Sequence, residues 1–116
     1  MKYALLIYYD QVARAQTTQE EQEASYQAYT EFGNEIERRG VLIDGRGLEP
    51  TTSATTIRVR NGKHLITDGP FVETKEQLAG FYLLDCKDLD EAIELATMIP
   101  SAIHGSIEIR PLAQYD

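Results

Sequence analysis

The chain has 116 residues, of which 42% are hydrophobic and 26% charged, and this composition and length are typical of one globular domain over residues 1–116. Its net charge of −8, with 11 scattered basic residues, argues against nucleic-acid binding, which requires clustered Lys and Arg. A single cysteine cannot form an internal disulfide, and no Cys/His cluster has the spacing of a metal site. The apolar run near the start is too short for a signal peptide or a membrane span. We therefore expect a cytoplasmic protein with no bound metal or cofactor.

The first half of the chain predicts a strand, a long helix and a short strand. Residues 3–9, YALLIYY, are apolar and aromatic without alternation, as in a strand covered on both faces. From residue 18 to residue 39 the pattern becomes helical, with a capping box at Thr18 and Glu21 and a C-terminal glycine at Gly40. The expected buried stripe of this helix is Ser25, Tyr29, Phe32 and Ile36. Residues 41–50 contain a short strand interrupted by two glycines.

The middle of the chain predicts a β-hairpin over TTIRVRNGKHLIT, residues 55–67. Asn61-Gly62 is a strong signal for a two-residue type I′ turn between alternating residues. Pairing across this turn places Val59 opposite His64 and Ile57 opposite Ile66 on a mainly apolar face. Arg58 and Arg60 point to the other face.

The last third predicts a strand, a helix and a strand. GFYLLDC, residues 80–86, is again apolar on both faces, and GSIEIRPL, residues 105–112, alternates. Between them, Asp88 and Glu91 fit a helix start and Pro100 fits a helix end. The expected buried stripe of this helix is Leu89, Ala92, Ile93, Ala96 and Ile99.

The order β-α-β-β-α-β with an extra β-hairpin is that of an α+β, ferredoxin-like fold. In this fold the first and third core strands are central, and those are the strands that are apolar on both faces. Two helices cover only one face of such a sheet, so the other face would expose a large apolar patch. We therefore expect a homodimer packed through its sheets, with a pocket on or near the covered face.

The segment Asp68-Gly69-Pro70-Phe71 has two interpretations. In the structural one, the Asp68 carboxylate accepts bonds from nearby backbone N–H groups, Phe71 is an inward anchor, and Thr74 caps one helical turn that includes Gln77. In the functional one, Asp68, Glu73 and Glu76 crowd one rigid corner, and such crowding favours a carboxyl group with a pKa near neutrality. Spacing alone leaves both interpretations open.

Other side chains are weaker candidates for a site. The catalytic candidates are Asp68, Glu73 and His104, which has the strand parity of Glu108 and Arg110. The ligand-binding candidates are Tyr8, Phe71, Arg58 and Arg110. A buried Tyr8 hydroxyl would need a hydrogen-bond partner, and Phe71 lies beside the corner. The guanidinium groups of Arg58 and Arg110 suit an anionic substrate. For each of them a purely structural role, in the core, in an interface or in an ion pair at its rim, is the alternative.

Five stretches resemble the YCII-related superfamily, and within it the branch named for its DGPF motif: MKYALLIYYD, ATTIRVRNGK, TDGPFVETKEQLAGFYLLD, DLDEAIELA and IEIRPL. The resemblance implies a ferredoxin-like fold assembled as a dimeric α+β barrel, and for some members a link to extracytoplasmic-function sigma factors. It also implies a His-Asp acid–base pair in the wider superfamily. That pair has no counterpart here, because the helix over residues 18–39 contains no histidine, and His64 lies roughly 13 Å along a strand from Asp68.

Three hypotheses for function follow from these observations. The first is a homodimer that binds a small organic ligand beside the Asp68–Phe71 corner in a sensory or sigma-factor-associated role. The second is a cofactor-free isomerase, lyase or hydrolase that moves protons with Asp68, Glu73 or His104. The third is a structural interaction module. A closed cavity with a carboxyl group of raised pKa would favour the second hypothesis over the first.

Overall fold

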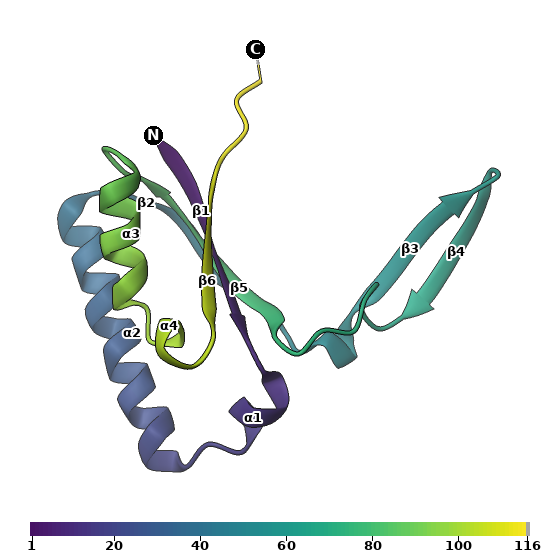
Figure 1. The fold of residues 1–116 in the computed structure, drawn as a ribbon, viewed down its shortest axis with the longest axis horizontal. Coiled ribbons are helices and arrows are strands. Elements are labelled where there is room, and N and C mark those ends of the chain that lie inside the picture. The colour runs from purple at the N-terminus through teal and green to yellow at the C-terminus, as the bar shows by residue number, and fades with distance from the viewer. Residues whose placement is uncertain (116) are drawn as a thin grey trace.

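The helices and strands are defined by a computed structural model, which describes residues 1–115 (Figure 1). In chain order they are β1 (Lys2–Tyr9), α1 (Gln11–Ala15), α2 (Gln19–Arg39), β2 (Leu42–Gly47), the short 3-10 helix η1 (Thr51–Ser53), β3 (Thr55–Arg60), β4 (Lys63–Asp68), β5 (Gln77–Asp85), α3 (Leu89–Met98), α4 (Ser101–His104) and β6 (Ser106–Pro111). Within the described residues, no helix is both long enough and apolar enough to cross a lipid bilayer.

The strands form two separate antiparallel sheets, one with the order β2-β5-β1-β6 and one of β3 and β4 alone. The inner strands of the larger sheet, β1 and β5, are the two that the sequence predicts to be central. The long helix α2 separates β1 from β2, and α3 separates β5 from β6. The α+β class is thus confirmed, and the order of the elements is compatible with the predicted ferredoxin-like plan.

Side-chain and glycine caps define both ends of α2. The Thr18 hydroxyl accepts a bond from the Glu21 N–H at 3.1 Å, and the Glu21 carboxylate accepts one from the Thr18 N–H at 3.2 Å. This reciprocal pair is the predicted capping box. At the other end, Gly40 adopts φ 68°, a left-handed conformation that favours glycine. The predicted stripe is also confirmed, because Phe32 and Ile36 are buried and Ser25 and Tyr29 are half-buried.

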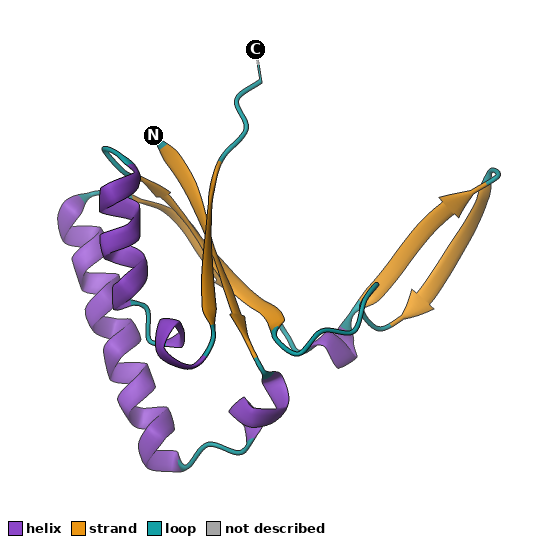
Figure 2. Cartoon of the chain, viewed as in Figure 1, coloured by secondary structure: helices purple, strands orange, loops and turns teal. Residues whose placement is uncertain are grey.

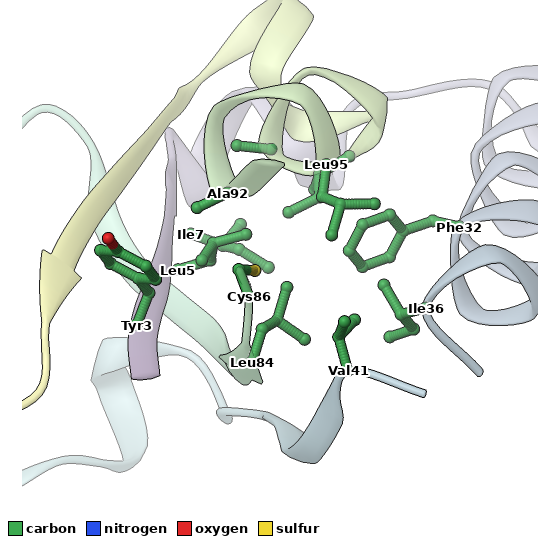
Figure 3. Close-up of a cluster of buried hydrophobic side chains, with 12 residues drawn as sticks. Tyr3, Leu5, Ile7, Phe32, Ile36, Val41, Leu84, Cys86, Ala92 and Leu95 are labelled. Atoms are coloured by element: carbon green, nitrogen blue, oxygen red, sulfur yellow. The ribbon is translucent and has the colours of Figure 1, made fainter. Parts of the chain in front are cut away.

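The hydrophobic core lies between the larger sheet and the helices α2 and α3, which cover the same face of the sheet (Figures 2 and 3). Alternate β1 residues, Tyr3, Leu5 and Ile7, point into it. Phe32 of α2 packs edge-on against Tyr82 of β5, with ring centroids 4.9 Å apart. The odd-numbered residues of β1 therefore form the helix-covered face, and the even-numbered ones form the helix-free face.

The buried face of α3 differs from the predicted one. Leu89 and Ile93 are exposed, and Leu95, which the prediction omits, is fully buried together with Ala92 and Ile99. A helix of ten residues permits more than one apolar stripe, and packing against α2 and the sheet selects the stripe through Leu95. The short helices α1 and α4 also lie outside the prediction, because one turn of helix has no detectable period.

The hairpin β3–β4 projects away from the rest of the chain as an arm (Figure 1). Its predicted register is confirmed, with Val59 opposite His64, Ile57 opposite Ile66, and Asn61 and Gly62 at positive φ in the turn. Neither strand of the arm contains a buried residue. The radius of gyration is 16.3 Å. A compact domain of this length would have about 13 Å, so the arm makes the single chain unusually extended.

Candidate functional site

A cluster of three polar side chains lies on the helix-free face of the larger sheet. Tyr8 is on β1, and Glu108 and Arg110 are on the neighbouring strand β6. The Tyr8 hydroxyl donates to Glu108 Oε1 at 3.5 Å, while Arg110 donates from Nε to Glu108 Oε2 at 2.8 Å and from Nη2 to Oε1 at 3.3 Å. The structure therefore brings together two of the predicted ligand-binding residues, Tyr8 and Arg110, through a shared carboxylate.

The ion pair determines the charge state of this cluster. The bonds from the Arg110 guanidinium lower the pKa of Glu108, and the Tyr8 hydroxyl contributes a smaller lowering. Glu108 in turn raises the pKa of Arg110. Both groups are consequently charged at neutral pH, and Glu108 is a poor proton acceptor because ionisation is already favoured.

Apolar side chains surround the cluster on the same face. In the register of the sheet, Leu6 of β1 pairs with Phe81 of β5 on one side and with Glu108 of β6 on the other. Leu6, Phe81 and Leu83 are half-buried, because no helix of residues 1–115 covers this face. An apolar surface around a few hydrogen-bonding groups is the usual composition of a small-molecule site.

The segment that precedes β5 reaches the same region through Glu76. The Ser106 hydroxyl, at the start of β6, donates to Glu76 Oε1 at 2.8 Å, and Ser106 pairs with Tyr8 in the sheet. From the sequence alone, Glu76 is only a member of the corner, Glu108 only shares the strand parity of His104 and Arg110, and Ser106 is not singled out. The sequence signal that connects Ser106, Glu108 and Arg110 is the alternation of residues along β6, which places all three on one face of the sheet.

Bonds to the backbone groups of Gly69, and not bonds to the Asp68 carboxylate, hold the Asp68–Phe71 corner. The Gly69 N–H donates to the Ala54 carbonyl at 2.7 Å, and the Thr56 hydroxyl donates to the Gly69 carbonyl at 2.8 Å. Gly69 adopts φ 100°, so this position favours glycine. The expected bonds from the backbone to the exposed Asp68 carboxylate are not formed within residues 1–115, which corrects that part of the structural interpretation.

Two further details of the structural interpretation are wrong. Phe71 is 73% exposed and is not an inward anchor of its own chain; its carbonyl accepts a bond from Arg58 Nη2 at 3.4 Å. Thr74 does not cap a helical turn. Its hydroxyl donates to the Glu76 carbonyl at 2.7 Å, and Gln77 Nε2 donates to the Thr74 carbonyl at 2.6 Å. These side chains bond to carbonyl groups, whereas a helix N-cap bonds to free N–H groups.

The predicted catalytic residues lie on separate parts of the chain. Asp68 ends β4, Glu73 is exposed in the segment before β5, and His104 ends α4. Within residues 1–115, no hydrogen bond or ion pair joins any two of them. His104 lies in the wall of a cavity between α1, α2 and α4, on the helix-covered side, whereas its parity suggested the opposite face.

Within residues 1–115, two of the cavities lie on the helix-covered side. The larger, with a volume of about 690 Å³, lies between α1, α2 and the α3–α4 segment. The smaller, about 270 Å³, lies beside β2 and β5, and Tyr9 and Arg14 line both cavities. Neither is lined by residues 68–76. Among residues 1–115, no group of three or more His, Cys, Asp or Glu side chains is arranged to hold a metal ion.

Comparison with known proteins gives the family but no activity. The YCII-related domain matches residues 1–116, the whole chain. An uncharacterised protein of Rhizobium meliloti (strain 1021) is 42% identical over 117 residues, which covers 99% of this chain and 94% of that protein. The chain belongs to the family of YCII-related domains.

Proposed function

We propose that the protein is a homodimer that binds a small organic molecule between two sheet faces, in the manner of a ferredoxin-like dimeric α+β barrel. Tyr8 and Arg110 orient the ligand, and the corner that contains Asp68 and Phe71 forms the rim of the site. The observation that carries this proposal is the helix-free face, where a hydrogen-bonded polar cluster lies among half-buried apolar side chains that no helix of residues 1–115 covers.

The first argument for a dimer is the apolar surface of the larger sheet. Leu6, Phe81 and Leu83 are adjacent on the two central strands and remain accessible to water. Soluble monomers rarely leave a contiguous apolar patch of this kind uncovered. A second copy presents the same patch, so packing the two faces together buries both at once.

The second argument is the arm. Ile57 and Ile66 lie opposite one another on β3 and β4 and are 60% and 67% exposed. An isolated two-stranded hairpin is only marginally stable in water. Contact with a partner subunit would bury these side chains and hold the arm, and it would place Arg58 and Phe71, which are joined by a hydrogen bond, at the edge of the partner's site.

The charge state of the cluster favours binding over proton transfer. Arg110 lowers the pKa of Glu108, so the carboxylate has little tendency to remove a proton from a substrate. The alternative, a cofactor-free acid–base enzyme, requires Asp68, Glu73 or His104 to reach one substrate. These residues occupy separate regions of one chain, which makes the binding function the better supported of the two.

Sedimentation velocity over a range of micromolar concentrations tests the dimer. We expect the wild type to sediment as two chains, and Leu6→Arg to sediment as one because it places a charge in the interface. The control is Val12→Arg, since Val12 is exposed on α1, outside both faces of the sheet. A well-behaved single wild-type chain across this range would overturn the assembly and the site with it.

Thermal-shift screening of small organic acids tests the ligand site. We expect compounds that stabilise the wild type to lose their effect in Arg110→Gln and to keep it in Arg38→Gln, whose arginine is on α2 and pairs with Glu35. Compounds that stabilise both variants equally would remove Arg110 from the site. For the enzyme alternative, Asp68→Asn should abolish turnover of a substrate found in such a screen, and unchanged turnover would exclude Asp68.

The regulatory setting is also a proposal. The resemblance to proteins linked to extracytoplasmic-function sigma factors suggests a sensory role, in which ligand binding changes the surface that the dimer offers to a regulator. Co-purification with such a sigma factor, with and without a screened ligand, would test it. Capture that is identical in both conditions would argue for a structural module instead of a sensor.

A further inference from the structure

The larger cavity on the helix-covered side is a site that the dimer proposal does not use. Its volume of about 690 Å³ is within the range of small-molecule pockets, and its walls come from three separate segments of the chain, α1, α2 and the α3–α4 segment. It is formed within one subunit on the side of the sheet opposite the Tyr8–Glu108–Arg110 cluster. Any ligand bound there is therefore independent of the proposed interface.

Arg14 of α1 is the main positive group in this cavity. Its guanidinium lies over the ring of Tyr9 at 5.5 Å from the centroid, and Nη1 donates to the Ser25 hydroxyl of α2 at 3.5 Å. Arg14 forms no ion pair with any carboxylate of residues 1–115. A half-buried guanidinium stacked on an aromatic ring and without a carboxylate partner is suited to binding an anion.

Two carboxylates also line the cavity, but hydrogen bonds to neighbouring donors already occupy them. Asp10 caps α1, accepting bonds from the N–H groups of Val12 and Ala13 at 3.0 and 3.2 Å. Glu21 accepts from the backbone N–H and the hydroxyl of Thr18 at 3.2 and 3.0 Å, and these bonds lower its pKa. Their negative charge is partly offset by the N-termini of α1 and α2, where Asp10 is the N-cap and Glu21 lies in the first turn. Arg14 and His104 have hydrogen-bonding capacity left for a ligand.

The remaining walls are mostly apolar and are held in place by contacts between the segments. Apolar side chains of α2 and of the α3–α4 segment line the interior: Ala24, Ala28, Met98, Ile99 and Pro100. The Tyr29 and Ser101 hydroxyl groups are hydrogen-bonded at 2.8 Å, which joins α2 to α4. A β-carbon at Gly105 would lie 2.1 Å from the Tyr8 carbonyl oxygen, so this glycine allows the end of α4 to pack closely against β1. The cavity is thus already formed in the free chain.

We propose that this cavity binds a small organic acid, with the carboxylate on Arg14 and an apolar body against the alanines of α2 and the α3–α4 segment. His104 of α4, which lines the same cavity, also contacts the ligand. The class of ligand follows from the chemistry of the walls, which combine an unpaired guanidinium with an apolar interior large enough for one or two rings.

Nuclear magnetic resonance titration with 1-naphthoate tests this site in the wild-type protein. The chain has two histidines, His64 on the arm and His104 in the cavity wall. The naphthalene ring should shift the imidazole resonances of His104 and leave those of His64 unchanged. The uncharged analogue 1-naphthalenemethanol should bind roughly ten- to a hundredfold more weakly, the range expected for loss of a charge-assisted hydrogen bond. Equal binding of the two compounds, or no shift at His104, would overturn the proposal.

Variants then test whether the naphthoate carboxylate binds to Arg14. Arg14→Met should weaken naphthoate binding by the same roughly ten- to a hundredfold factor, while Arg60→Met, at the exposed tip of the arm, should not change it. Ala28→Phe should block the cavity without removing a charge, with circular dichroism to verify folding. Arg110→Met separates this site from the proposed interface site, because the His104 shift should persist in it. Wild-type affinity in Arg14→Met would refute the assignment.

Discussion

The two faces of the four-stranded sheet differ in what covers them, although the same strands supply both. On β1, Leu5 is fully buried beneath the helices, whereas the next residue, Leu6, is half-buried beside Phe81 and Glu108. The helix-covered face is thus completed by the chain itself, and the helix-free face is not. One strand sequence that is apolar on both faces therefore supplies the folding core of one chain and, in the proposed dimer, a surface for association.

Truncation of neighbouring leucines on β1 should give the largest contrast between the two faces. Leu5→Ala removes a fully buried side chain and should lower the free energy of unfolding by about 2–5 kcal/mol at every protein concentration. Leu6→Ala should act mainly through the proposed dimer, so its loss of stability should depend on protein concentration. Urea unfolding followed by circular dichroism at several concentrations measures both effects. Equal, concentration-independent losses would contradict the distinction between the faces.

A smaller effect is expected where the helix-covered layer meets the sheet. Gly105→Ala would place a β-carbon 2.1 Å from the Tyr8 carbonyl oxygen and 3.0 Å from Tyr9 Cβ. Backbone or side-chain shifts are needed to accommodate it, and we expect a loss of about 1–3 kcal/mol. The matched control is Gly33→Ala, because a β-carbon there meets no atom within 4 Å and the position is inside α2. That change should increase stability by up to about 1 kcal/mol, since alanine favours helix more than glycine does.

Thermal unfolding of the two glycine variants at one concentration gives this comparison directly. A stability of Gly105→Ala equal to that of the wild type would mean that the α4–β6 turn relaxes freely, and that close packing at β1 does not position His104.

Features set by adjacent residues were predictable from the sequence, because the interactions that define them are local. The Thr18–Glu21 capping box, the left-handed Gly40 and the Asn61-Gly62 turn all appear as predicted. The central positions of β1 and β5 were also predictable, since only strands inside a sheet need to be apolar on both faces.

Features that depend on tertiary packing were not predictable in the same way. The stripe of α3 passes through Leu95 instead of Leu89 because α2 and the sheet select the face. The contact of Glu108 with Tyr8 and Arg110 depends on the register of β1 and β6, and spacing along the chain does not specify register. The turn before Phe71 predicts an inward role for its ring, yet nothing local to a turn determines which part of the chain, or which partner, covers a side chain.

Two tyrosine hydroxyl groups, one on each face of the sheet, allow the faces to be compared by smaller changes in the free energy of unfolding, of about 1 kcal/mol. Tyr29 on the helix-covered side bonds at 2.8 Å to Ser101, which is only 7% exposed. Tyr29→Phe leaves the buried serine without this partner and should cost about 0.5–1.5 kcal/mol. Tyr8→Phe removes a 3.5 Å contact on the helix-free face and should change the stability of the single chain very little. A larger loss in Tyr8→Phe than in Tyr29→Phe, measured by urea unfolding, would reverse this ranking.

The Tyr29 phenol should also give a pH dependence. Burial raises the pKa of Tyr29 above its ordinary value of 10.0. A group whose pKa is higher in the folded state than in the unfolded state adds to the free energy of unfolding. This stabilisation is fully present below the pKa of the unfolded state and is lost as the pH rises through the pKa of the folded state. The free energy of unfolding of the wild type should therefore decline above pH 10 more steeply than that of Tyr29→Phe. Parallel curves for the two proteins would show that Tyr29 does not contribute.

The smallest expected effect concerns Glu108, which lies on the helix-free face of the sheet. Bonds from Arg110 lower the pKa of Glu108 below its ordinary value of 4.5. The Glu108 carboxylate therefore stabilises the folded chain above pH 4.5, and this stabilisation is lost only as the pH falls through the lowered pKa of the folded state. The ¹³C shift of the Glu108 carboxyl group should therefore titrate below the ordinary range in the wild type and return toward it in Arg110→Gln. Arg60→Gln, which changes an arginine on the arm, should leave the titration unchanged. An ordinary titration in the wild type would show that the guanidinium is not held against the carboxylate in solution, and Arg110 would then be free to bind an anionic ligand without first breaking an ion pair.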